Sequence, residues 1–148
     1  MTQLTPHFSL EELTFTEHRE FDNIPNESEI KNLKRLAQFL EMVKEQLDNK
    51  PIMINSGFRS EALNRSLGSK DSSQHRVGCA ADLRVPGMTP DEVVKAIIAS
   101  SLPFDQVIRE FCTPTGGGWT HVSVPNDPTG QPRRQALIID KAGTRLYS

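Results

Sequence analysis

Apolar residues recur every three or four positions between Asn26 and Asp48. This spacing predicts a long amphipathic helix, with Asn26 or Ser28 as its N-terminal cap. One face of the predicted helix carries Ile30, Leu33, Ala37, Leu40, Val43 and Leu47, widened by Leu36 and Phe39. Because a chain of 148 residues needs such a face to cover its sheet, we interpret it as core and not as a groove for a partner.

Three shorter helices are predicted from their capping residues. Ser9-Leu10-Glu11-Glu12 has the pattern of a capping box. Ser60 is placed to cap a second short helix, which Gly68 would end. Thr89-Pro90-Asp91-Glu92 combines a cap, a proline at the first helical position and an acid at the third. Each pattern marks the start of a helix that would pack against a sheet.

Five segments have the short apolar or alternating pattern of β-strands, near Ile52, Leu83, Val107, Val122 and Ile138. Together with the helices they predict an α+β fold. We expect one small domain over residues 1–148, in which a mostly antiparallel sheet is packed by helices. The sequence contains no internal repeat and no linker that would indicate a second domain.

Alternation along two of these strands places polar side chains on one face of the sheet. Asp82 lies on that face, while the opposite face of its strand carries Ala81, Leu83 and Val85. His121 lies on the polar face of its own strand, while the opposite face carries Thr120, Val122 and Val124. A polar loop ahead of the first strand carries His75, and Gly78 allows a sharp turn or a close approach after it. Two strands and a loop therefore bring three polar residues toward one point.

These three residues, His75, Asp82 and His121, make up the ligand set of a catalytic zinc site. Such a site uses three protein ligands and keeps the fourth position for water. We therefore predict a Zn2+ site on the sheet face, against the alternative that the residues meet by coincidence. Cys79 and Cys112 form no C-x-x-C pair, and we leave both out of the ligand set.

A family resemblance rests on the same residues. Ser73-x-His75-x-x-Gly78-x-Ala80-x-Asp82, followed by Trp119-x-His121, resembles the M15 family of zinc peptidases. The family includes D-alanyl-D-alanine carboxypeptidases, D-Ala-D-Ala dipeptidases and bacteriophage L-alanyl-D-glutamate endolysins. The resemblance includes Ser56-Gly57-Phe58-Arg59 and residues 104–111, so it spans most of the chain from Pro51 to Val124. It is strongest to small single-domain peptidases of phages and prophages, and it implies zinc on His75, Asp82 and His121.

The sequence departs from the family at the position of the general base. Several family members carry an acid three residues before the second histidine, where this chain has Gly118. Glu110 is our candidate for the catalytic base, because it ends the apolar run Val107–Ile108 in a neighbouring strand. If Glu110 pairs roughly opposite His121, both side chains lie on one face, and the carboxylate can transfer a proton from water to the leaving amine. The alternative is that Glu110 is solvated or only orients a ligand.

Three further residues are candidates for substrate binding: Arg59, Ser73 and Trp119. By the resemblance, Arg59 binds substrate, and its guanidinium suits the carboxylate of a peptide stem that ends in D-amino acids. Ser73 would hydrogen-bond the substrate backbone or, alternatively, cap its own loop.

The composition indicates an ordinary globular protein. Hydrophobic residues make up 36% and charged residues 24%, and the net charge of -2 gives no sign of a nucleic-acid-binding surface. No apolar run is long enough to span a membrane, and the N-terminus lacks the features of a signal peptide. We expect a monomer that is synthesised in the cytoplasm and acts on the cell wall after lysis.

Together these observations predict a zinc peptidase that hydrolyses peptidoglycan stem or cross-link peptides by metal-activated water. It would act as a carboxypeptidase or as an endolysin-type endopeptidase. The alternative is a non-catalytic, zinc-stabilised binding or virion-associated module of the same fold, and the missing acid before His121 is the feature that favours it.

Overall fold

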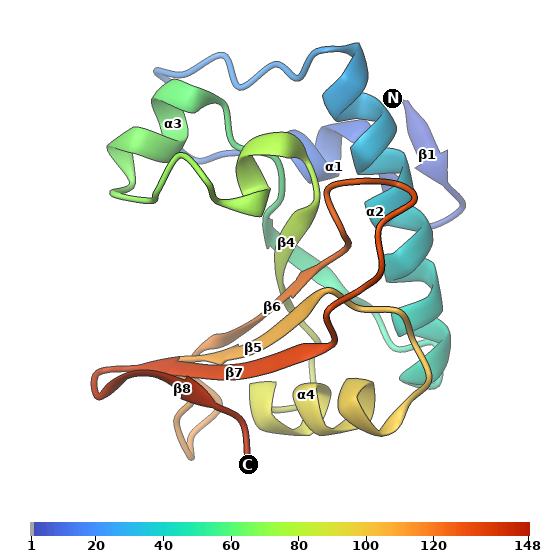
Figure 1. Ribbon diagram of the computed structural model, residues 1–148, viewed down its shortest axis with the longest axis vertical. Helices are drawn as coiled ribbons and strands as arrows, with labels where there is room; N and C mark the ends of the chain where they lie inside the picture. The colour runs from blue at the N-terminus through green and yellow to red at the C-terminus, as the bar shows by residue number, and fades with distance from the viewer. Residues whose placement is uncertain (1) are drawn as a thin grey trace.

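Most of the strands form one central sheet, and the helices pack around it (Figure 1). The structure is a computed structural model and describes residues 2–148. The helices are α1 (Leu10–Thr14), α2 (Glu27–Gln46), α3 (Glu61–Ser66), the short 3-10 helix η1 (Gln74–Val77) and α4 (Pro90–Ala99). The strands are β1 (Gln3–Thr5), β2 (Phe8–Ser9), β3 (Met53–Ser56), β4 (Ala80–Arg84), β5 (Gln106–Glu110), β6 (Trp119–Ser123), β7 (Gln135–Asp140) and β8 (Gly143–Leu146).

The central sheet has six strands in the order β3-β4-β6-β5-β7-β8. Neighbouring strands are antiparallel except β5 and β7, which run parallel. The predicted α+β class with a mostly antiparallel sheet is therefore confirmed. All five predicted strands are present, and they form the part of the sheet from β3 to β7.

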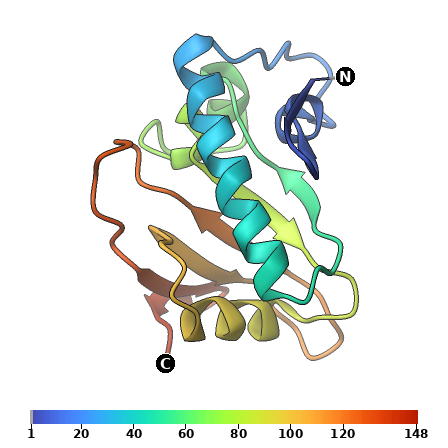
Figure 2. The same cartoon turned by 90° about the vertical axis from the view of Figure 1, so that its right-hand side faces the viewer.

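One face of the sheet is covered by α2 and α4. In Figure 2, α2 crosses in front of the strands, and α4 lies below the C-terminal end of α2. Both helices begin with a capping box: the side chain of Asn26, one of the two predicted caps of α2, accepts from the backbone of Glu29, and the predicted cap Thr89 accepts from Glu92. The apolar face of α2 is core as expected, since the residues from Leu33 to Val43 on that face are buried. Within residues 2–148 no helix is both long and apolar enough to cross a membrane.

Three parts of the structure have little signal in the sequence. The β1–β2 hairpin consists of strands of three and two residues, too short to show a periodic pattern. All four residues of β8 are exposed, so no alternation of apolar and polar residues marks it as a strand. The segment around His75, expected to be a loop, forms the 3-10 helix η1, which Ser73 caps. These elements depend on contacts that form only in the folded chain.

Packing of α2 against the sheet should dominate the stability of the fold. Leu40 is fully buried in the core, so Leu40→Ala should lower the free energy of unfolding by about 2–5 kcal/mol. Leu146 is 71% exposed, and Leu146→Ala should change it by less than about 0.5 kcal/mol. Denaturant unfolding measures both values, and similar losses in the two variants would contradict this packing.

Candidate metal centre

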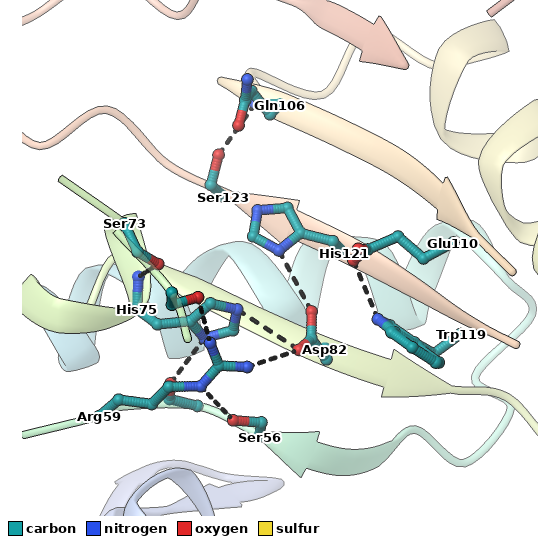
Figure 3. Close-up of polar contacts among 12 residues, drawn as sticks. Ser56, Arg59, Ser73, His75, Asp82, Gln106, Glu110, Trp119, His121 and Ser123 are labelled. Carbon is teal, nitrogen blue, oxygen red and sulfur yellow. Dashed lines mark hydrogen bonds and ion pairs between the residues drawn. The ribbon is translucent and has the colours of Figure 1, made fainter. Parts of the chain in front are cut away.

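Three buried polar side chains meet on the sheet face opposite α2 and α4. Asp82 on β4 is paired directly with His121 on β6, so both side chains point to the same side of the sheet. His75 reaches them from η1, and Figure 3 shows the three converging. Their exposed fractions are only 3%, 8% and 9% for His75, Asp82 and His121. The sequence prediction that these residues come together agrees with this placement.

The three side chains are close enough to share one ion. His75 Nε2 lies 3.4 Å from Asp82 Oδ2, and His121 Nδ1 lies 3.1 Å from Asp82 Oδ1. One ligand atom from each residue lies within 4.8 Å of the other two. The imidazole rings are arranged edge to face, with their centres 5.1 Å apart. Two nitrogens and a carboxylate oxygen therefore face one small volume.

The tautomer of His75 is set by the backbone. His75 Nδ1 lies 2.8 Å from the carbonyl oxygen of Gly57, which can only accept a hydrogen bond. The Nδ1 atom must therefore carry a proton, which leaves Nε2, the nitrogen that faces Asp82, as the one that can bind a metal. Metal-bound histidines commonly donate their second N–H in this way, which fixes both the tautomer and the orientation of the ring.

The carboxylate of Asp82 is held in its charged form. Burial would raise its pKa, but the neighbouring His75 and His121 outweigh burial and hold the pKa of Asp82 well below its usual range. Arg59 Nη2 adds a third donor, 3.2 Å from Asp82 Oδ2. A buried anion beside two imidazoles is a strong binding point for a cation.

This donor set fits zinc. Imidazole nitrogen and carboxylate oxygen are both common zinc ligands, and three protein ligands are the number found in catalytic sites. Cys79 lies in the hydrophobic core on the other side of the sheet, which agrees with leaving it out of the ligand set. The fit therefore rests on His75, Asp82 and His121, with no thiol among the ligands.

Glu110 lies on the same sheet face as the three residues, but in a different register from the one expected. It pairs with Trp119, whereas Ile108 pairs with His121. The expectation that Glu110 lies roughly opposite His121 is therefore wrong by two residues. Because side chains alternate along a strand, a shift of two keeps Glu110 on the expected face. The indole Nε1–H of Trp119 donates to Glu110 Oε2 at 2.9 Å and orients the carboxylate (Figure 3).

The surroundings of Glu110 make it a stronger base than an exposed glutamate. Burial raises its pKa, and the charge of Asp82 raises it further. His121, Trp119 and Arg59 act in the opposite direction without cancelling the rise. A carboxyl group with a raised pKa is better matched to proton transfer near neutral pH.

The backbone explains why the acid is not located at position 118. Gly118 has a φ of +89°, and a Cβ atom there would lie 2.4 Å from the carbonyl oxygen of Glu110 and 2.6 Å from that of Phe111. No side chain fits in that space without moving the backbone. The tight approach between the ends of β5 and β6 therefore excludes a carboxylate on Gly118, while the same approach brings Glu110 beside Trp119.

A cleft of about 700 Å³ connects these groups. All of the site residues predicted from the sequence line it: Arg59, Ser73, His75, Asp82, Glu110, Trp119 and His121. Sequence reasoning missed other residues of the lining, among them Gln106, Arg133 and Ile139. The last two lie beyond Val124, where the recognisable motifs end, and only the folded chain brings them to the cleft.

The three candidate substrate-binding residues also have partners within the protein. Arg59 donates from Nε to Ser56, from Nη1 to Ser69 and from Nη2 to Asp82, at 3.0, 3.4 and 3.2 Å. The hydroxyl of Ser73 accepts from the backbone N–H of His75 at 3.3 Å, so it caps its own loop. Trp119 holds Glu110. Each of these residues therefore supports the site as well as lining the cleft.

The sequence matches the family model described as Peptidase M15 over residues 6–123. The chain belongs to the M15 peptidase family. Its class is therefore that of a metallopeptidase, which implies a peptide substrate. The match includes every predicted ligand and Glu110 but ends before β7 and β8. No match to a curated protein was found.

The metal assignment can be tested by composition. We expect about one zinc per chain, and His75→Ala or His121→Ala should lose it and lower the melting temperature, because metal binding contributes to folding. His7→Ala is a matched control, since that side chain is 56% exposed and is paired with Glu41. Elemental analysis measures the zinc, and an unchanged zinc content in both site variants would overturn the assignment.

Proposed function

We propose that this protein is a zinc-dependent peptidase that hydrolyses the stem or cross-link peptides of peptidoglycan. The observation that carries the proposal is the buried cluster of His75, Asp82 and His121 at the base of a cleft that also contains Glu110. Membership of the M15 family supports the peptidase class. The cleavage would be that of a carboxypeptidase or an endolysin-type endopeptidase, acting on the cell wall after lysis.

The metal would be held by His75 Nε2, the Asp82 carboxylate and His121 Nδ1. When bound, zinc supplies Lewis-acid chemistry: it polarises a carbonyl and makes a water molecule more acidic. The protein contributes the orientation of the ligands. The carbonyl of Gly57 fixes one imidazole, and direct pairing of β4 with β6 holds the other two ligands together.

Glu110 would move the proton. Its carboxylate takes a proton from the attacking water and delivers it to the nitrogen of the leaving amine. Trp119 keeps the carboxylate turned along the sheet face through its indole N–H. Burial favours the reaction, because it raises the pKa of Glu110 and strengthens each polar interaction in the cleft.

Arg59, Ser73 and Trp119 would contact the substrate from the walls of the cleft. Arg59 lies beside Asp82 and can place positive charge near the reacting carbonyl. Trp119 offers an apolar ring surface, tilted against that of Phe111 at a centre-to-centre distance of 5.5 Å. Ser73 keeps its backbone and hydroxyl near the ligand His75.

A non-catalytic role was favoured by the missing acid before His121. The backbone at Gly118 leaves no room for a side chain, and Glu110 on β5 is our candidate to supply the carboxylate instead. The site therefore contains both a set of metal ligands and a candidate base. We therefore propose that the protein is an enzyme. A negative result in the test below would favour the non-catalytic binding module.

Digestion of purified peptidoglycan tests this function. The zinc-loaded protein should release peptides or amino acids that mass spectrometry identifies, a chelator should abolish the release, and added zinc should restore it. The mass of the products would identify the bond that is cut. A zinc-loaded, folded protein that releases nothing from peptidoglycan would contradict the proposal and favour a structural zinc.

Glu110→Gln separates catalysis from metal binding. The amide keeps the shape and can still accept from Trp119, so we expect zinc and fold to be retained while turnover falls by roughly 10²–10⁴-fold. Glu45→Gln, an exposed position on α2, is the matched control and should leave turnover unchanged. Turnover of Glu110→Gln close to that of wild type would assign the base to another group, and loss of zinc would make Glu110 a ligand or its support.

A further inference from the structure

Among residues 2–148, two side chains with a permanent positive charge line the cleft, Arg59 and Arg133. They differ in how many donors remain free. All three nitrogens of the Arg59 guanidinium donate to protein oxygens, and its side chain is only 13% exposed. Three of its five N–H groups are therefore engaged, and little of its side chain is open to solvent. The side chain of Arg133 is more exposed, and fewer of its N–H groups are engaged.

Arg133 is anchored on one edge and open on the other. Its Nε and Nη2 donate to the carboxylate of Asp105, the shortest contact being 2.7 Å, and its backbone N–H donates to the same group. Within residues 2–148 none of its hydrogen bonds uses Nη1. The side chain is 53% exposed, whereas that of Asp105 is 6% exposed. A buried carboxylate thus fixes the orientation of the guanidinium of a residue that lines the cleft, and its Nη1 is left without a protein partner among the described residues.

The anchor is built into the fold. Asp105 directly precedes β5, and it also accepts from Gln74 Nε2 at 3.1 Å, which is the neighbour of the ligand His75 in sequence. Gln74 donates to the backbone oxygen of Val124 as well, so it ties η1 to the segment between β6 and β7. This segment arches beside α2 in Figure 1 and carries Arg133 to the cleft. The guanidinium is therefore held relative to the metal ligands.

Strand geometry places Arg133 relative to the proposed reaction. Gln106 follows Asp105, and it lies at the opposite end of β5 from Glu110 (Figure 3). Ile108 is the residue paired with His121, and a strand rises about 3.3 Å per residue, so Gln106 is about 7 Å along the strand from that pair. One residue of an extended peptide covers about 3.3 Å. A group bound at Arg133 would then be one to a few residues from the reacting bond.

We propose that Arg133 is a specificity-determining residue that binds a free carboxylate of the peptide substrate through Nη1. The proposal rests on the proposed function and names the class of substrate: a peptide with a carboxylate one to a few residues from the bond that is cut. A peptidoglycan stem offers two such groups, the C-terminal carboxylate and the α-carboxylate of a γ-linked glutamate. Both present the same chemistry to an arginine.

Two features favour recognition over a purely structural role. Asp105 already accepts from Gln74 and from the backbone of residue 133, so it does not depend on the guanidinium alone. In addition, Arg133 lies outside the segment that matches the M15 family, residues 6–123. The proposed metal ligands and base thus lie within the family match, whereas the proposed recognition residue lies outside it. This division is expected if Arg133 selects the substrate while residues on η1, β4, β5 and β6 carry out the reaction.

The test compares how tightly the protein with Arg133 and the Arg133→Gln variant bind three synthetic stem peptides. The first peptide has both carboxylates free, the second is amidated at the C-terminus, and the third is amidated at the glutamate. Dissociation constants are measured by calorimetry with zinc-loaded protein in the Glu110→Gln background, so that the peptides stay intact. Arg133→Gln should weaken binding of the fully free peptide about tenfold to hundredfold. It should change binding by less than about twofold for the one peptide that lacks the recognised carboxylate, because the two changes then remove the same interaction.

Arg145→Gln is the matched control. Arg145 is likewise held by a carboxylate, Asp140, at 2.8 Å, but it lies on β8 outside the cleft lining, so its loss should leave all three affinities unchanged. Unchanged binding of the insensitive peptide shows that Arg133→Gln is folded. Equal weakening for all three peptides, or no weakening for any, would overturn the proposal. Wild-type protein that shows the expected pattern of binding but cleaves none of the peptides would contradict the proposed function and leave the role of Arg133 standing.

Discussion

The buried carboxylate of Asp82 is the feature on which the rest of the site depends. An ion removed from water costs several kcal/mol unless charges and hydrogen bonds compensate it, and breaking such a buried arrangement typically costs about 3–5 kcal/mol. Here the compensation comes from three directions, His75 on η1, His121 on β6 and Arg59 after β3. These segments are far apart in sequence, so the site can exist only when η1 and both strands are in place. The need to neutralise one charge thus links the architecture of the sheet to its chemistry.

The arrangement of β5 and β6 shows a second constraint, which is steric. Gly118 allows the two strand ends to approach so closely that its own position cannot carry a side chain. An acidic side chain three residues before His121 is therefore impossible in this backbone. The adjacent strand supplies Glu110, and Trp119 directs it along the sheet face. The cleft therefore still contains a carboxylate close to the three ligands, which we propose as the base.

Local patterns in the sequence were sufficient to predict the four α-helices, five strands and the convergence of His75, Asp82 and His121, since ligand type and strand alternation are properties of short segments. The register of Glu110 was not predictable in this way. It is set by the backbone after β5, where Phe111 has a φ of +52° and Gly118 closes the turn. Arg133 was also missed, because its role depends on the buried Asp105, which is 28 residues away in sequence. Features fixed by contacts between distant segments require the folded structure.

The central claim is that one metal ion binds between η1, β4 and β6. The most direct measurement is anomalous diffraction at the zinc absorption edge from crystals of the purified protein. Our account predicts one anomalous peak, bonded to His75 Nε2, Asp82 and His121 Nδ1, with Gly57 still accepting from His75 Nδ1. A peak elsewhere, or binding through His75 Nδ1 with the contact to Gly57 broken, would contradict it.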